Sequence, residues 1–129
     1  MGDIYRGKRP LSPFMIGPYY KPQITSITSI LTRITGIALL FTGLLVVWWF
    51  LAAAAGPEAF ETANWWLTSY LGDLIMLLSL IGFWYHFCAG LRHLYWDTGR
   101  GLELETAEKL GWACLIGSVV MTLFTIIIV

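Results

Sequence analysis

The sequence predicts an all-α membrane protein with three transmembrane helices, and three observations support this fold class. The 129 residues are 57% hydrophobic and only 12% charged, whereas a soluble domain of this size needs a more charged surface. Three long apolar stretches are each long enough to cross about 30 Å of hydrocarbon as a helix. The basic residues also gather on one predicted side of the membrane, as the positive-inside rule requires.

The three helices can be placed from the apolar stretches. The first is expected over residues 23–55, because no charged residue occurs between 34 and 55. The second is expected over 65–97, where only His86 interrupts the apolar run 74–91. The third is expected over 106–129, since residues 110–129 are uncharged. We therefore expect residues 1–22 to be a cytoplasmic N-terminal segment and residues 23–129 to be a single membrane domain.

The charge distribution predicts the orientation. The connection 52–64 contains Glu58 and Glu61 but no Lys or Arg, whereas basic residues precede the first helix and flank the second connection. The N-terminus is therefore expected in the cytoplasm and the C-terminus in the periplasm of a bacterial inner (plasma) membrane. The formal net charge of zero gives no reason to expect a nucleic-acid partner. The basic residues are Arg6, Lys8, Arg9, Lys21, Arg33, Arg92, Arg100 and Lys109.

His86 is the candidate metal ligand. With Gly82, Gly90, His93 and Asp97, it falls in a stripe about 80° wide at 100° per residue. Ionisable groups at membrane depth are costly and usually functional, and the glycines leave room for a flat group. Neutral imidazole suits haem iron. The alternative is a buried histidine that is hydrogen-bonded to a neighbouring helix, and spacing alone does not separate the two.

His93 cannot be the second ligand of the same haem. It lies seven residues, or about 10 Å, further along the same face of the same helix. The chain has only two histidines, so a six-coordinate haem would need its other ligand from another polypeptide.

Arg92, His93 and Asp97 lie near the predicted inner end of the second helix. His93 is a candidate for contact with a haem propionate or for a proton route to the cytoplasm. Arg92 and Asp97 are weaker candidates for the same roles. A structural alternative is strong for both, because Arg can extend to lipid headgroups and Asp97 precedes the helix-ending Thr98 and Gly99.

Ser29 and Arg33 form the candidate quinone-binding pair. They lie one turn apart on a face that also carries Ser26, Gly36 and Gly43. A hydroxyl can donate to a neutral carbonyl oxygen, and a permanent cation stabilises the negative charge that develops on reduction. The alternative is that the serines allow close helix packing while Arg33 contacts lipid phosphate.

Three segments resemble the cytochrome b membrane-anchor subunits of succinate dehydrogenase, the respiratory complex II. They occur in the family's order on the same three-helix plan, and the resemblance covers nearly the whole chain from Arg9. The run from His86 to Asp97 is the most specific. The segments are residues 9–13 (RPLSP), 29–36 (SILTRITG) and 86–97 (HFCAGLRHLYWD).

The resemblance implies the cofactor, substrate and partners. His86 would ligate one haem b shared with a second hydrophobic anchor subunit in a helical bundle, and Ser29 and Arg33 would bind ubiquinone or menaquinone. An iron–sulfur subunit and a flavoprotein subunit would complete the enzyme. The chain has no flavin-binding fingerprint and no cluster-forming cysteines, so its expected contribution is to quinone reduction and not to succinate oxidation. Thr32 and Phe14 depart from the family, which commonly has histidine at these positions.

Two alternatives stay open at this point. One is a cytochrome b anchor of another quinone-linked enzyme, such as fumarate reductase. The other is a purely structural membrane anchor without haem, whose polar residues only pack the helices.

Overall fold

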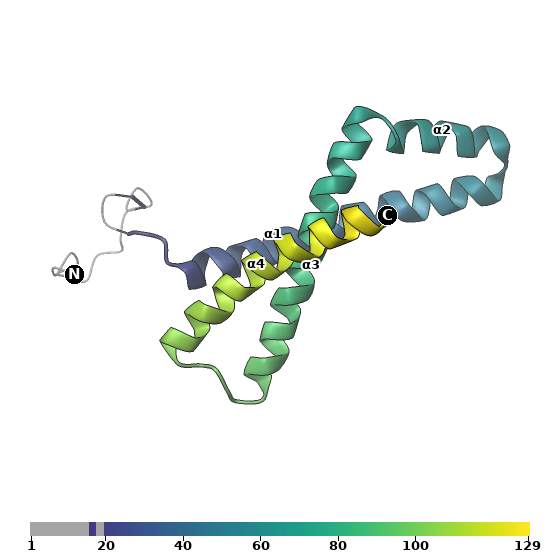
Figure 1. Ribbon diagram of the computed structural model, residues 1–129. Coiled ribbons are helices and arrows are strands. Elements are labelled where there is room, and N and C mark those ends of the chain that lie inside the picture. Colours follow the sequence, from purple (N-terminus) through teal and green to yellow (C-terminus); the bar gives the residue numbers. More distant parts are fainter. Residues whose placement is uncertain (1–15, 18–19) are drawn as a thin grey trace, which may run out of the picture.

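The structure, a computed structural model, describes residues 16–17 and 20–129. This part of the chain forms four helices and no β-strand (Figure 1). Three of them, α1, α3 and α4, are long and apolar enough to cross a membrane, which confirms the predicted fold class. Most of the expected N-terminal segment, including Arg6, Lys8, Arg9 and Phe14, lies outside the described residues. The helices are α1 (Ile24–Ala55), α2 (Pro57–Leu67), α3 (Tyr70–Asp97) and α4 (Leu104–Ile128).

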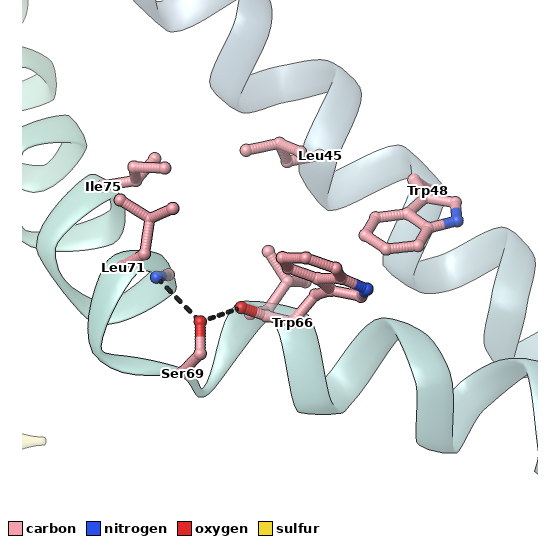
Figure 2. Close-up of a pocket in the computed structure, with 8 residues that line it drawn as sticks. Leu45, Trp48, Trp66, Ser69, Leu71 and Ile75 are labelled. Atoms are coloured by element: carbon pink, nitrogen blue, oxygen red, sulfur yellow. Dashed lines mark hydrogen bonds between the residues drawn. The ribbon is translucent and has the colours of Figure 1, made fainter.

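The helix expected over 65–97 begins at Tyr70 instead, and the residues before it form a separate helix, α2, over Pro57–Leu67. Gly56, with a φ of 133°, turns the chain after α1, and Pro57 begins α2, a position that suits the fixed φ of proline. α2 ends at Leu67, and Ser69 caps α3 by accepting a hydrogen bond from the backbone N–H of Gly72 at 3.2 Å. The Ser69 hydroxyl also donates to the Trp66 carbonyl at 2.7 Å (Figure 2). The sequence carries a signal for this break, because the polar residues Thr68 and Ser69 separate the apolar residues of the two helices.

α2 lies beside the C-terminal turns of α1, at the end of the spans away from the N-terminus (Figure 1). Trp49 of α1 connects the two helices, because its ring centroid lies 5.3 Å from that of Phe60 and its Nε1 donates to Asn64 Oδ1 at 3.4 Å. An apolar cavity of about 210 Å³ opens where α1, α2 and α3 meet. Figure 2 shows Trp48 and Trp66 facing it from two different helices. The cavity is lined mainly by apolar side chains.

Small side chains bring the three long helices together. Ala89 of α3 is fully buried and packs with Tyr85 and Cys114 in the core. A Cβ added at Gly111 of α4 would lie 3.3 Å from Ile24 Cγ1 of α1, so glycine permits the close approach of these helices. Most large apolar side chains point outward instead, as expected for helices that face lipid or another polypeptide.

The polar contacts between α1 and α3 follow a regular pattern. Three threonines seven residues apart on α1 contact polar side chains of α3, and we call them the threonine seam. A spacing of seven returns to nearly the same helix face, so the seam fixes how α1 is rotated against α3. The contacts join Thr28 to Arg92 (2.9 Å), Thr35 to His86 (3.1 Å) and Thr42 to Ser79 (2.7 Å).

Candidate functional site

The His86 imidazole lies against α1. Its Nδ1 is 3.1 Å from Thr35 Oγ1, and its Cε1 would be 3.1 Å from a Cβ added at Gly36. Glycine at position 36 therefore leaves the space that the ring occupies. This contact with Thr35 is the hydrogen bond to a neighbouring helix that is expected if His86 is a buried packing residue and not a ligand. That bond uses only one ring nitrogen, and Nε2 has no hydrogen-bond partner among the residues that the structure describes.

The chemistry of the His86 environment suits a histidine that would ligate haem iron. An imidazole with one nitrogen bonded to the protein and the other available is the usual arrangement of a metal-ligating histidine. A Cβ added at Gly90, one turn after His86, would meet nothing within 4 Å, whereas one added at Gly82, one turn before it, would lie 3.7 Å from Thr35 Cγ2. The surface beside the ring is therefore open on the Gly90 side. The described residues contain no cluster of three or more His, Cys, Asp or Glu that could hold a metal ion. Haem iron does not need one, because the porphyrin supplies four of its ligands.

Arg92 is held within the helix packing. Its side chain is only 4% exposed, and Nη1 donates to Thr28 Oγ1 at 2.9 Å. The guanidinium also lies 4.7 Å from the centre of the Trp96 ring, close enough for a cation–π interaction. The Tyr85 hydroxyl donates to the Thr28 carbonyl at 2.7 Å, beside this contact. Arg92 thus connects α3 to α1 instead of extending toward lipid headgroups.

His93 and Asp97 are exposed near the end of α3. His93 Nδ1 lies 2.7 Å from the Ala89 carbonyl, and because a carbonyl only accepts, this nitrogen carries the proton. The ring meets Trp96 edge-on at 5.3 Å. Trp96 in turn donates from Nε1 to the Gly101 carbonyl at 2.9 Å, which connects the end of α3 to the following loop.

Ser29 and Arg33 lie on α1 beside the threonine seam but take no part in it. Ser29 is half-buried and Arg33 is exposed. No hydrogen bond or ion pair joins either side chain to another residue in the described part of the chain. Their neighbours behave differently, because Thr28 contacts Arg92 and Thr32 donates to the Thr28 carbonyl at 2.8 Å. A hydroxyl and a cation are therefore presented together on an open face of the helix.

Sequence reasoning missed Thr28, Thr35 and Tyr85, which hold the candidate site residues in place. The signal was present in the spacing of Thr28, Thr35 and Thr42, three hydroxyl-bearing residues on one face of a transmembrane helix. Polar side chains on such a face often bond to a neighbouring helix. Which residue each threonine would meet depends on how the helices cross, and this is not encoded locally.

Comparison with known proteins identifies the family. The family model for the succinate dehydrogenase/fumarate reductase transmembrane subunit matches residues 6–125. The chain belongs to this family. It is 47% identical over 128 residues to the succinate dehydrogenase cytochrome b556 subunit of Paracoccus denitrificans, covering 99% of this chain and 97% of that protein. It is 38% identical over 121 residues to the subunit of the same name from Rickettsia bellii, covering 94% and 92% of the two chains.

A more distant relative is the succinate dehydrogenase cytochrome b560 subunit of Reclinomonas americana. It is 37% identical over 125 residues, covering 93% of this chain and 85% of that protein. These matches place the chain among the cytochrome b membrane subunits of succinate dehydrogenase, an oxidoreductase. They confirm the family predicted from the three sequence segments, and the cytochrome b name implies haem b.

Proposed function

We propose that this chain is one of two membrane anchors of succinate:quinone oxidoreductase and that His86 would ligate a single haem b. The observation that carries this proposal is the environment of the His86 ring. Nδ1 is hydrogen-bonded to Thr35, Gly36 accommodates the ring, and Nε2 remains available. A further protein ligand would come from a second hydrophobic subunit, because His93 is too far along the same helix to bind the same haem.

Ser29 and Arg33 form part of the quinone-reduction site. Ser29 donates a hydrogen bond that orients the ring of ubiquinone or menaquinone through a carbonyl oxygen. Arg33 stabilises the negative charge that develops on the quinone oxygen as electrons arrive. Arg33 is exposed in the isolated chain, so neighbouring subunits complete the pocket and exclude lipid from it. A haem bound nearby supplies a one-electron acceptor and donor.

The orientation of the chain determines where electrons and protons enter. An iron–sulfur subunit docks on the cytoplasmic side of a bacterial inner membrane, close to Ser29 and Arg33, and receives electrons from a flavoprotein subunit that oxidises succinate. Quinone takes up two electrons and two protons to form quinol, and the protons come from the cytoplasm. The N-terminus of this chain is cytoplasmic and its C-terminus periplasmic.

The candidate residues near the inner end of α3 differ in solvent exposure, since Arg92 is buried and His93 and Asp97 are exposed. His93 and Asp97 are exposed there and share the stripe of His86, so they are the candidates for a propionate contact or a proton route. Arg92 lies six residues after His86, which is about 120° away around the helix axis. Its contacts with Thr28 and Trp96 favour a mainly positional role.

A visible absorption spectrum of the purified complex tests the proposal. We expect a reduced haem α-band in the wild type, its loss in His86→Ala and its retention in Ser29→Ala. Quinone reductase activity should fall in Ser29→Ala despite the intact band, because this residue contacts the substrate and not the haem. Absence of an α-band from the wild-type complex would instead support a structural anchor without haem.

A further inference from the structure

We propose that Thr35 is a positioning residue that fixes the tautomer of His86 and tunes the electron-donating strength of its Nε2. The inference deepens the proposed function and rests on His86 being a haem ligand. Thr35 belongs to α1, whereas the proposed ligand His86 belongs to α3.

The direction of the hydrogen bond follows from the number of protons available. A threonine hydroxyl has one proton and two acceptor lone pairs. Thr35 Oγ1 lies 2.8 Å from the Leu31 carbonyl and 3.2 Å from the Thr32 carbonyl, so its proton is directed to its own helix. At 3.1 Å from His86 Nδ1, the hydroxyl oxygen therefore accepts, and Nδ1–H of His86 donates.

This arrangement determines which ring nitrogen is available. A neutral imidazole with its proton on Nδ1 has its lone pair on Nε2. The place of the ring beside Thr35 depends on the glycine at position 36, because a Cβ there would lie 3.1 Å from Cε1. A chain of hydrogen bonds then runs from His86 through Thr35 to the Leu31 carbonyl. Each bond polarises the next, which makes Nε2 a stronger electron donor toward a metal.

The consequence is a preference for the oxidised metal. A stronger donor stabilises ferric iron more than ferrous iron, so removal of the Thr35 hydroxyl should raise the midpoint potential of the haem. Loss of the groups that orient a metal ligand typically weakens metal binding by about 10–100-fold. If the ferric form loses about tenfold more affinity than the ferrous form, the rise is about 59 mV for a one-electron couple.

The threonine seam supplies a matched control. Thr42 lies seven residues after Thr35 on the same face of α1 and contacts Ser79 Oγ of α3 at 2.7 Å. Thr42→Val removes a hydroxyl from the same kind of contact between the same two helices. It leaves the hydrogen bond of His86 intact.

The experiment is a redox titration of the haem α-band in the intact complex, with haem content measured on the same samples. We expect Thr35→Val to raise the midpoint potential and lower haem retention. Thr35→Ser, which keeps the hydroxyl, should retain the wild-type values, as should Thr42→Val. If Thr35→Val does not assemble, Thr35→Ala replaces it in the same titration.

An unchanged potential in the assembled Thr35 variant that lacks the hydroxyl would overturn the inference. An equal shift in Thr42→Val would also overturn it, because the effect would then come from helix packing. Both results leave the wild-type α-band in place. A wild-type complex without haem would refute the proposed function itself, so the two failures can be distinguished.

Discussion

Two polar faces of α1 differ in whether their side chains have hydrogen-bond partners. The threonine seam consists of Thr28, Thr35 and Thr42, whose hydroxyl groups find hydrogen-bond partners on α3 of the same chain. Ser29 and Arg33, on the adjoining face of α1, have no such contact among the described residues. One face therefore holds the fold together, while the other has no partner in the described part of the chain.

The difference gives a criterion for interpreting polar residues in membrane helices. A polar group surrounded by hydrocarbon is costly unless it finds a partner. A group whose polar atoms all find partners in its own chain needs no further explanation than packing, whereas His86 has such a partner for Nδ1 alone. A group without such a partner requires a ligand, a neighbouring subunit or lipid headgroups, and is the better candidate for function.

The largest effect should follow a change on the open face. Arg33→Gln removes the cation proposed to stabilise the reduced quinone, so kcat for quinone reduction should fall about 10²–10³-fold. Haem content and thermal stability should hardly change, because no described residue depends on Arg33. Steady-state assays of the intact complex measure the rate with quinone as the electron acceptor. A second assay uses a dye that accepts electrons before they reach the quinone site, and this rate should not change. Arg100→Gln, an exposed change in the loop after α3, is the control. A normal rate in Arg33→Gln would refute its role.

A change in the seam should act on stability instead. Thr28→Val removes the hydroxyl that accepts from Arg92 Nη1 and leaves the buried guanidinium with a lost hydrogen bond. The expected loss is about 1–3 kcal/mol in the free energy of unfolding, measured as a lower thermal transition of the purified complex. Thr28→Ser should restore most of the stability. If Thr28→Val impaired quinone reduction at unchanged stability, the division between the two faces would be wrong.

A smaller effect is expected for the hydroxyl of the open face. Ser29→Ala removes one neutral hydrogen bond to the quinone, so KM should rise about five- to tenfold, with the α-band unchanged. Ser26→Ala is the matched comparison, since the Ser26 hydroxyl donates to the Gln23 carbonyl at 2.8 Å and is satisfied locally. An equal rise in KM for both variants would show that position on this face does not matter.

The smallest effect should come from an exposed ion pair that belongs to neither face. Lys109 Nζ lies 2.7 Å from Glu105 Oε1 on α4, and both side chains are largely exposed. Glu105→Gln should change the free energy of unfolding by less than about 0.5 kcal/mol. It provides the baseline against which the thermal transitions of the seam variants are judged, and a larger loss would mean that α4 is held by surface charge.

The sequence predicted the long helices well because hydrocarbon thickness and the cost of charge leave few alternatives. It did not predict the break at Ser69, because Ser and Thr such as Ser69 and Thr68 also occur within transmembrane helices. The contacts of Arg92 were also missed. Its position near the predicted helix end suggested lipid headgroups, whereas packing turns it toward Thr28 on α1.

The candidate site could be predicted only as a set of residues. Helical periodicity grouped His86 with its stripe and Ser29 with Arg33, and the family match supports the general function. The roles assigned to these residues stay predictions. The contact between His86 and Thr35 could not be inferred from periodicity, because it depends on how α1 and α3 cross.

An experimental structure of the intact complex tests the central claim most directly, since it shows what completes the open positions of α1 and α3. We predict a porphyrin at His86 Nε2, with a ligand from a different polypeptide on its other side, and Nδ1 still hydrogen-bonded to Thr35. A complex in which His86 Nε2 faces acyl chains, or packs against protein backbone with no porphyrin nearby, would contradict the account.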